Sequence, residues 1–323
     1  MATSVTTRQL PRIVRDMTQT ELPPEFDPLL DHYGTLTTDR DQLLWQWLYY
    51  VFPSFRLSSV PDEYGALARK AKFCFSVYMT VLDDLSERHL DKETFEQGRK
   101  IPFSSTRCDA EAPGADTEAL ALLQESWDLT KAYLSRAPRR GDFEELFEFD
   151  LRQSLNTMDY NRLVNEGPQL ASPRGAEMYD THNMLLFIYV DIDLAFSPDF
   201  DLADLATLRD VTWDAQRLAR IGNWVTTWER ELDECDYTSR VVVEALARGV
   251  VTEAEIRDDD VPNETIARRI KDAGIEREHL LSWNETYRSL VSREYDVDSV
   301  DLHSFVDGMR HLLEVDVKAR GLK

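Results

Sequence analysis

The sequence contains few cysteines, glycines and prolines for its length. Its 323 residues include 3 cysteines, 12 glycines and 13 prolines. The cysteines, Cys74, Cys108 and Cys235, are too few and too scattered for a disulfide framework or a zinc site. The scarcity of glycine and proline argues against a fold of short strands and tight turns, and it favours long helices.

Lysine is also scarce, and positive charge is outnumbered. The chain has 60 acidic and 37 basic residues, 29 of them arginine, for a net charge of −23. This charge argues against non-specific binding to nucleic acid or to an anionic membrane. Dense carboxylate with little lysine is typical of proteins from a high-salt cytoplasm, where salt screens self-repulsion. An ordinary acidic cytosolic protein is the alternative interpretation.

The chain has no long uninterrupted apolar run. Residues 1–20 are polar and lack the apolar stretch of a signal peptide. The longest apolar segment, Met184 to Phe196, is interrupted by Asp191 and Asp193 and is too short to span a bilayer. We therefore expect a soluble, cytoplasmic protein without stable membrane insertion.

Apolar residues recur at helical spacing through most of the chain. This pattern predicts helices over residues 41–52, 62–87, 116–134, 142–164, 176–195, 201–236, 239–248, 252–257, 262–273, 276–293 and 300–318. Residues 100–116 contain two prolines and read as a loop. Because strand signals and fixed-period repeats are lacking, we expect an all-α protein, with a polar N-terminal arm (residues 1–27) and a single helical domain (residues 28–323).

The first candidate cluster is an acidic run, DDLSE, at the end of a predicted helix. Asp83 and Glu87 stand four positions apart and share a face, with Asp84 adjacent. That face continues upstream as a partly hydrophobic wall, formed by Thr80, Met79, Ser76 and Phe75. Grouped carboxylates repel one another unless a cation joins them, and Mg²⁺ accepts one or two carboxylates together with waters and phosphate oxygens. A solvated acidic helix end is the alternative.

The second cluster is a polar stripe on an otherwise apolar helix. Asn223, Thr227 and Glu231 stand four positions apart, so a helix places their oxygens in one row. Asparagine and threonine are poor helix formers, and buried amides and hydroxyls need partners. The stripe therefore predicts Mg²⁺ carrying a diphosphate, or else a structural network between helices. One turn back, Ala219 is small enough to border a cavity, and Arg220 is placed to reach a phosphate oxygen or a carboxylate.

Together the two clusters resemble the metal motifs of class I terpene synthases, DDxx(D/E) and a later N-D-x-x-S-x-x-x-E. DDLSE supplies the first, and Asn223, Thr227 and Glu231 match the ligands of the second. The run Glu229-Arg230-Glu231 is similar to the family's E-K-E ending, whose basic residue faces the diphosphate. The resemblance implies one α-helical bundle of the class I terpenoid synthase type and, with the composition, a halophilic archaeal source.

The resemblance spans residues 40–318, and the chain departs from the family pattern at three places. Trp224 replaces the aspartate that usually follows the asparagine. The family's diphosphate-sensing arginine has no counterpart within residues 177–182, and Arg174 stands slightly too early. The C-terminal Arg-Tyr pair is missing, which leaves Arg320 as a candidate substitute.

The resemblance implies Mg²⁺-dependent loss of diphosphate from an allylic prenyl diphosphate, of C15 or C20 length, followed by cyclisation or elimination to a terpene hydrocarbon or alcohol. It implies three Mg²⁺ ions with the diphosphate, and dimers are common in the family, so a homodimer is one expectation. The expected metal ligands are Asp83, Asp84, Glu87, Asn223, Thr227 and Glu231. Arg230 is the expected catalytic cation, and Phe75 and Met79 are expected to bind substrate.

Several further residues have both a functional and a structural interpretation. The aromatic residues Tyr78, Phe187 and Tyr189 either line the pocket or belong to the ordinary hydrophobic core. His182 is either a proton acceptor or a hydrogen-bonded histidine of the core or surface. Two other functions remain open. One is a chain-elongating prenyl diphosphate synthase, which usually carries two DDxxD motifs, and the other is a helical interaction protein without chemistry.

Overall fold

The computed structural model describes residues 11–37, 40–258 and 260–321. This part of the chain folds into helices joined by short turns and contains no strand, which confirms the all-α prediction. No helix within these ranges is long and apolar enough to cross a membrane.

The α-helices are α1 (Arg12–Thr18), α2 (Asp27–Leu36), α3 (Gln42–Val51), α4 (Asp62–Asp83), α5 (Lys92–Gly98), α6 (Thr117–Leu134), α7 (Arg140–Glu166), α8 (Pro173–Met178), α9 (Leu186–Ala195), α10 (Leu205–Asp233), α11 (Arg240–Ala247), α12 (Glu253–Ile256), α13 (Asn263–Asp272), α14 (Ile275–Ser292) and α15 (Leu302–Ala319). Short helical turns are η2 (Pro24–Phe26), η3 (Phe52–Phe55), η4 (Asp84–Arg88), η5 (Pro168–Leu170), η6 (Asp180–Met184) and η7 (Leu202–Asp204).

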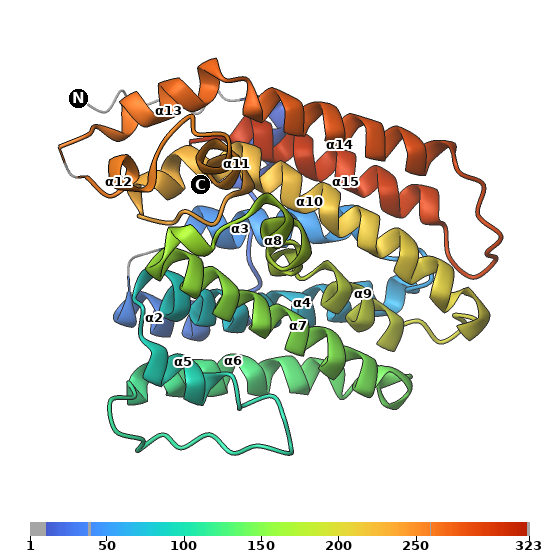
Figure 1. Ribbon diagram of the computed structural model, residues 1–323. Coiled ribbons are helices and arrows are strands. Elements are labelled where there is room, and N and C mark those ends of the chain that lie inside the picture. The colour runs from blue at the N-terminus through green and yellow to red at the C-terminus, as the bar shows by residue number, and fades with distance from the viewer. Residues whose placement is uncertain (1–10, 38–39, 259, 322–323) are drawn as a thin grey trace.

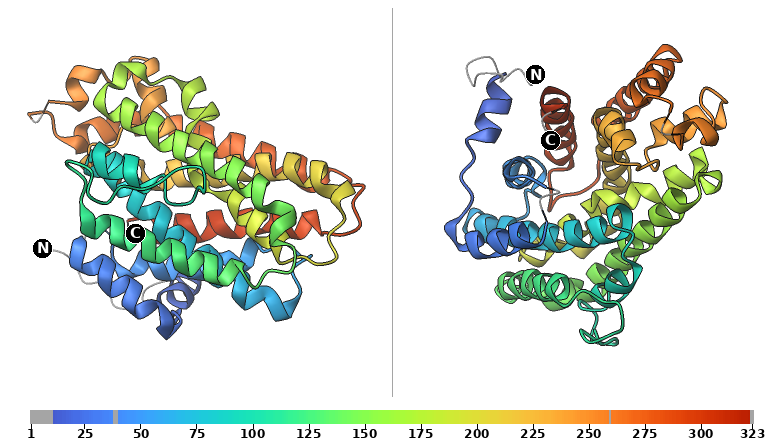
Figure 2. Two further views of the ribbon diagram at one scale, coloured as in Figure 1. Left: turned by 90° about the horizontal axis from the view of Figure 1, so that it is seen from below. Right: turned by 90° about the vertical axis from the view of Figure 1, so that its left-hand side faces the viewer.

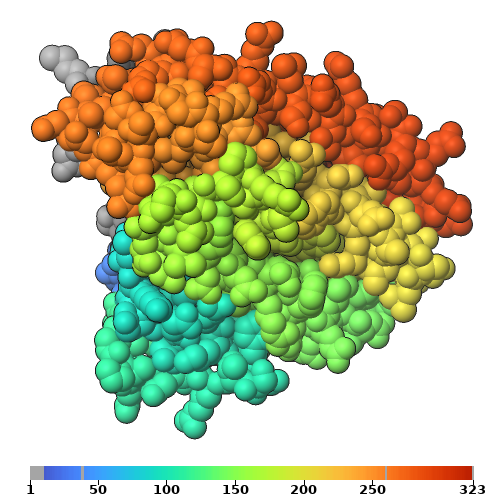
Figure 3. All heavy atoms as spheres, in the orientation of Figure 1, coloured from blue at the N-terminus to red at the C-terminus, as the bar shows by residue number. Residues whose placement is uncertain are grey.

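The long helices lie side by side in a bundle. Helix α4 packs on α6 and α9, while α10 packs on α14, α15 and α9. Figure 1 shows α14 and α6 at opposite edges with α4, α7, α9 and α10 between them, and Figure 2 gives the end-on view. Most of the buried apolar side chains in the described residues form one cluster that extends from Val14 to Ala319. The expected loop at residues 100–116 carries no helix and lies at the lower edge of the molecule (Figure 3).

Aspartate side chains begin three of the helices close to where the sequence predicts them. Asp41 accepts a hydrogen bond from the Leu43 amide at the start of α3. Asp116 accepts hydrogen bonds from two amides at the start of α6, and Asp301 accepts one from the Ser304 amide at the start of α15. A capping carboxylate satisfies first-turn N–H groups that have no partner within the helix. The local sequence therefore determines these helix starts.

The described part of the expected N-terminal arm is packed into the protein. Residues 11–27 form α1, η2 and the start of α2, and Val14, Met17 and Phe26 are fully buried. The Phe26 ring stacks on Phe73 of α4 at a centroid distance of 4.5 Å. A few apolar anchors in a polar segment are enough to bury it, which corrects the expectation of an arm. Residues 1–10 of that arm lie outside the described residues.

The segment expected as one helix over residues 176–195 is broken into α8, η6 and α9. Leu185 joins η6 to α9 with a φ of 60°, a left-handed conformation that is uncommon for residues other than glycine. The Gln216 side chain of α10 accepts hydrogen bonds from the amides of Leu186 (3.0 Å) and Phe187 (3.4 Å). A cap supplied from a distant helix therefore starts α9, and the local sequence carries no sign of it.

Two aspartates of α9 lie in the apolar core. Asp193 accepts hydrogen bonds from Lys72 (2.7 Å) and from the Leu57 amide (3.0 Å). Asp191 has weaker compensation, because its nearest cation, Arg209, is 3.8 Å away and is engaged by both oxygens of Asp150. Burial, and then the Asp150 charge, raise the pKa of Asp191 well above its usual value.

We predict that Asp191→Asn stabilises the protein above neutral pH. The folded state holds the Asp191 proton more tightly than the unfolded chain does, so raising the pH above the ordinary pKa of 3.8 favours unfolding. An amide cannot ionise, so the variant should melt roughly 2–4 °C higher than the parent at pH 8, about the effect of 1 kcal/mol, and match it near pH 4. Thermal unfolding across pH checks this, and an equal effect at both pH values would contradict it.

A close approach between α15 and η3 depends on Gly308. A Cβ atom on this residue would lie 2.2 Å from the Ser54 carbonyl oxygen and 2.8 Å from its carbon. Both atoms belong to the backbone, so the two elements would have to move apart.

We predict that Gly308→Ala lowers the free energy of unfolding by about 1–3 kcal/mol, the usual cost of overpacking. Gly34→Ala in α2 is the matched control, because a Cβ atom there meets nothing within 4 Å. The control should be neutral or stabilising, because alanine is the better helix former. Chemical denaturation measures both, and equal values for the two variants would refute the steric explanation.

Candidate active site

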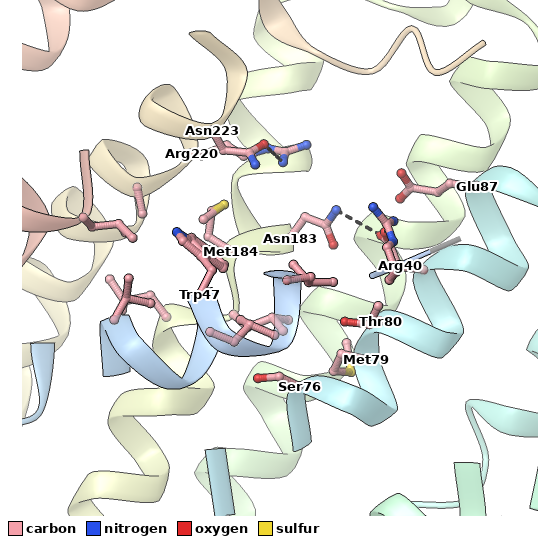
Figure 4. Close-up of a pocket in the computed structure, with 18 of the residues that line it drawn as sticks. Arg40, Trp47, Ser76, Met79, Thr80, Glu87, Asn183, Met184, Arg220 and Asn223 are labelled. Carbon is pink, nitrogen blue, oxygen red and sulfur yellow. Dashed lines mark hydrogen bonds and ion pairs between the residues drawn. The ribbon is translucent and has the colours of Figure 1, made fainter. Parts of the chain in front are cut away.

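A cavity of about 200 Å³ lies between α3, α4, α9 and α10. Figure 4 shows Glu87, Arg220 and Asn223 toward one end of it, with Met79 and Ser76 farther along. Its apolar lining comes mainly from Leu44, Trp47, Leu48, Val51, Phe52, Phe55, Met79, Met158, Met184, Leu185, Leu186, Tyr189 and Leu312. The cavity therefore joins a charged end to an apolar end.

The acidic run of the first cluster adopts a wide turn. Helix α4 ends at Asp83 and continues as η4, a π-helical turn in which the His89 amide donates to the Asp84 carbonyl (2.9 Å). Asp83 and Glu87 line the cavity. Asp84 is buried behind them, where it accepts hydrogen bonds from the Tyr33 hydroxyl (3.0 Å) and Arg40 Nε (3.0 Å). Such π turns are frequent at functional sites, and the regular helix spacing did not predict this one.

The two carboxylates that line the cavity here, Asp83 at the end of α4 and Glu87 in η4, have incomplete charge compensation. Asp83 accepts hydrogen bonds from Asn183 (3.2 Å) and Arg40 (3.4 Å), and Glu87 accepts one from Asn161 (2.9 Å). Loss of hydration raises the pKa of Asp83, although the Arg40 charge opposes the rise. Loss of hydration, and then the Asp83 charge, raise the pKa of Glu87 well above its usual value. Both carboxylates would gain from a nearby cation.

The second cluster meets the same cavity. Asn223 and Glu231 line it, as do Ala219 and Arg220. Thr227, the third residue of the stripe, is not among the residues that line the cavity; its hydroxyl donates to the Asn223 carbonyl (2.7 Å). The two clusters, remote in sequence, therefore share one cavity.

Glu231 is buried and short of positive charge. Burial, and then the Asp236 charge, raise the pKa of Glu231 to about 7, against the opposing effect of Arg220 and Arg230. Arg230 lines the cavity and donates to Glu234 at 2.6 and 2.8 Å, and Arg88 lies 3.5 Å from the same carboxylate.

Sequence analysis missed several residues that line the cavity. Glu234 and Asp236 continue the acidic run that follows Glu231, which is a signal that could have found them. Arg40, Arg88 and Asn183 carry no local signal, because each reaches the cavity from a turn or an irregular connection.

The sequence also provided no reason to single out Asp180. This fully buried carboxylate of η6 accepts two hydrogen bonds from Arg220 (2.7 and 2.5 Å) and one from Trp224 Nε1 (2.7 Å). Asn161 of α7 donates both to Asp180 and to Glu87, at 2.9 Å each. Arg220 also donates to the Asn223 side-chain oxygen (2.6 Å; Figure 4). A continuous polar network therefore links η4 to the stripe on α10.

Some residues named from the sequence lie elsewhere. Phe75 does not line the cavity, because its side of α4 faces α7, where it packs edge-on against Phe147 at 5.7 Å. Arg320 is also away from the cavity and pairs with Glu276 (2.7 Å) and with Glu229. The remaining aromatic candidates divide between the two interpretations: Tyr189 lines the cavity, whereas Tyr78, Phe187 and His182 do not. Met79 lines the cavity, as the helix face predicts.

No protein-family model matches the sequence, and no curated protein is significantly similar to it. Membership of the class I terpene synthases therefore stays a prediction that rests on the two clusters and on their placement.

The cavity offers oxygen donors suited to Mg²⁺. Its carboxylates are Asp83, Glu87, Glu231, Glu234 and Asp236. Within the described residues, no group of three or more His, Cys, Asp or Glu side chains is close enough to hold a metal ion. Mg²⁺ in phosphate-binding sites usually takes only one or two carboxylates, with phosphate and water oxygens completing its shell. Burial, and then neighbouring carboxylate charges, raise the pKa values of Glu87 and Glu231, and a bound cation would oppose both effects.

We predict that Asp180→Ala destabilises the protein by about 3–5 kcal/mol, the usual cost of leaving a buried charge without its partner. The double variant Asp180→Ala/Arg220→Met should recover part of this loss, because it removes the stranded guanidinium as well. The control is Glu148→Ala, which breaks an exposed pair with Arg152 and should cost less than about 1 kcal/mol. Chemical denaturation tests the three variants, and a loss for Asp180→Ala no larger than the control would overturn the role of the network.

Proposed function

We propose that the protein is a Mg²⁺-dependent class I terpene synthase. It would release diphosphate from an allylic prenyl diphosphate and convert the remaining chain to a terpene hydrocarbon or alcohol by cyclisation or elimination. One observation carries the proposal: the acidic turn η4 and the polar stripe of α10, far apart in sequence, line one cavity whose other end is apolar.

The charged end supplies both metal ligands and anion donors. Asp83 and Glu87 would hold Mg²⁺ from one wall, and Asn223, Thr227 and Glu231 from the other. When bound, Mg²⁺ neutralises the negative charge that develops on a departing diphosphate. Arg220 and Arg230 present fixed guanidinium donors to phosphate oxygens. Asp84 supports this wall from behind rather than facing the cavity, since Tyr33 and Arg40 occupy it.

The apolar end suits a hydrocarbon chain. Trp47, Phe52, Phe55 and Tyr189 line it, together with aliphatic and methionine side chains. Such walls exclude water from a reactive cation. An aromatic face stabilises a nearby cation by roughly 0.5–2 kcal/mol. No protein nucleophile is required, because the departing group leaves with the bonding electrons.

The cavity volume favours the shorter of the expected substrates. About 200 Å³ is below the ~300–1,000 Å³ usual for ligand sites. A C15 chain therefore fits with less side-chain movement than a C20 chain.

We predict that Mg²⁺ with inorganic pyrophosphate raises the melting temperature of the protein, whereas either one alone has a smaller effect. Ligand at about 100 times its dissociation constant adds about 2.7 kcal/mol of stability. Asp83→Ala and Asn223→Ala should each abolish this shift because they remove ligands from opposite walls. Asp128→Ala and Asn284→Ala, at exposed helix positions, are the matched controls and should retain it. A wild-type shift in both active-site variants would refute the metal assignments.

The same variants provide the catalytic test. Wild-type protein is incubated with C10, C15 or C20 allylic diphosphate and Mg²⁺ in high salt, and the extracted products are analysed by mass spectrometry. We expect a terpene from the C15 substrate and no diphosphate release by Asp83→Ala or Asn223→Ala. Added isopentenyl diphosphate should leave the product unchanged, and chain growth would instead identify an elongating synthase. Absence of both pyrophosphate binding and diphosphate release would favour a non-catalytic helical protein.

A further inference from the structure

Arg40 contacts the acidic run at residues 83–87, although it lies outside the helices that carry the candidate metal ligands. It lies in the connection between α2 and α3, and its guanidinium contacts two adjacent carboxylates. Nε and Nη2 lie 3.0 and 2.8 Å from Asp84 Oδ1, and Nη2 lies 3.4 Å from Asp83 Oδ2. Figure 4 shows Arg40 at the cavity, near Asn183 and Glu87. A cation of the protein itself therefore sits on the predicted metal-binding carboxylates.

The guanidinium takes the place that a metal ion needs on Asp83. Of the two oxygens of Asp83, one accepts from Asn183 and the other faces Arg40. A metal ion that binds the second oxygen competes with the guanidinium for it. The metal ion would replace the positive charge of the Arg40 guanidinium on Asp83. Metal alone therefore binds less favourably here than it would at a carboxylate without a cationic partner.

Arg40 has room to leave. Besides the active-site cavity, it lines a second cavity of about 640 Å³ bounded by residues 18–22, by α2 and by the start of α3. Its side chain is 17% exposed, and its residue is not part of a helix. The guanidinium of Arg40 contacts only the side chains of Asp83 and Asp84 in this acidic run, so its release breaks no backbone hydrogen bond of α4 or η4. Movement of the Arg40 side chain alone can therefore expose Asp83 and Asp84 to another cation.

We propose that Arg40 is a removable counter-cation that couples divalent-metal binding to diphosphate binding. The inference rests on the proposed function, since it assumes that Asp83 accepts the metal. Metal alone must displace the guanidinium and leave it without its acidic partners. When a diphosphate enters with the metal, the displaced guanidinium gains a phosphate partner at the same end of the cavity. Each ligand then favours the other, because a coupling free energy acts equally on both.

Arg40→Gln tests the coupling through Mn²⁺ binding, which needs no turnover. Free Mn²⁺ is measured by electron paramagnetic resonance during titration of the protein, with and without inorganic pyrophosphate. In the wild type we expect weak Mn²⁺ binding that pyrophosphate strengthens. In Arg40→Gln, Mn²⁺ alone should bind about tenfold more tightly and the strengthening by pyrophosphate should fall about tenfold, within the usual range of coupling between sites.

Arg320→Gln is the matched control. Arg320 also bridges two carboxylates, of Glu276 and Glu229, but lies outside the cavity. This variant should behave as the wild type in both titrations. If Arg40→Gln gives the same values as Arg320→Gln, the counter-cation role is wrong. If the wild type itself binds no Mn²⁺ with pyrophosphate, the proposed function fails instead.

A second substitution keeps the test decisive if Arg40→Gln does not fold. Arg40→Lys retains the charge but loses the planar fork that contacts both carboxylates. Without pyrophosphate, Arg40→Lys should bind Mn²⁺ more tightly than the wild type does. Its affinity should be lower than that expected for Arg40→Gln, which has a neutral side chain. Wild-type affinity for Mn²⁺ alone in Arg40→Lys would overturn the proposal.

Discussion

The placement of carboxylates inside an apolar bundle constrains the rest of this structure. Asp84, Asp180 and Glu231 are all buried, and an uncompensated charge in such a place costs several kcal/mol. Asp84 and Asp180 receive donors from other elements. Tyr33 and Arg40 reach Asp84, whereas Arg220, Trp224 and Asn161 serve Asp180 from α10 and α7. The helices must pack so that these donors arrive together.

The buried carboxylates of the network differ in how many hydrogen bonds and cations compensate their charge. Asp180 has four hydrogen bonds from three side chains, so it serves to hold η6, α7 and α10 together. On the cavity side, burial and neighbouring carboxylate charges raise the pKa values of Glu87 and Glu231. A bound cation would lower both pKa values, which is consistent with the proposed metal and diphosphate site.

Two of the places where regular helix gives way face this cavity. The π turn η4 begins directly after Asp83; Asp83 and Glu87 line the cavity, Asp84 lies behind them, and Arg40 contacts both Asp83 and Asp84. The left-handed residue Leu185 restarts the chain as α9 against the same cavity. Backbone in sparsely populated conformations persists when surrounding contacts determine it, and here Gln216 of α10 provides such contacts.

Local pattern determined the all-α class and most helix boundaries, because apolar periodicity and aspartate caps act within a few residues. It also placed Asp83 and Glu87 on one face and Asn223 and Glu231 on another, since helical spacing alone sets which side chains share a face. Only the tertiary structure decided which faces meet, that Phe75 turns toward α7, and that the chain breaks at Leu185. Arg40 could not be found from sequence, because a long side chain on an irregular connection has no periodicity and its partners are chosen by packing.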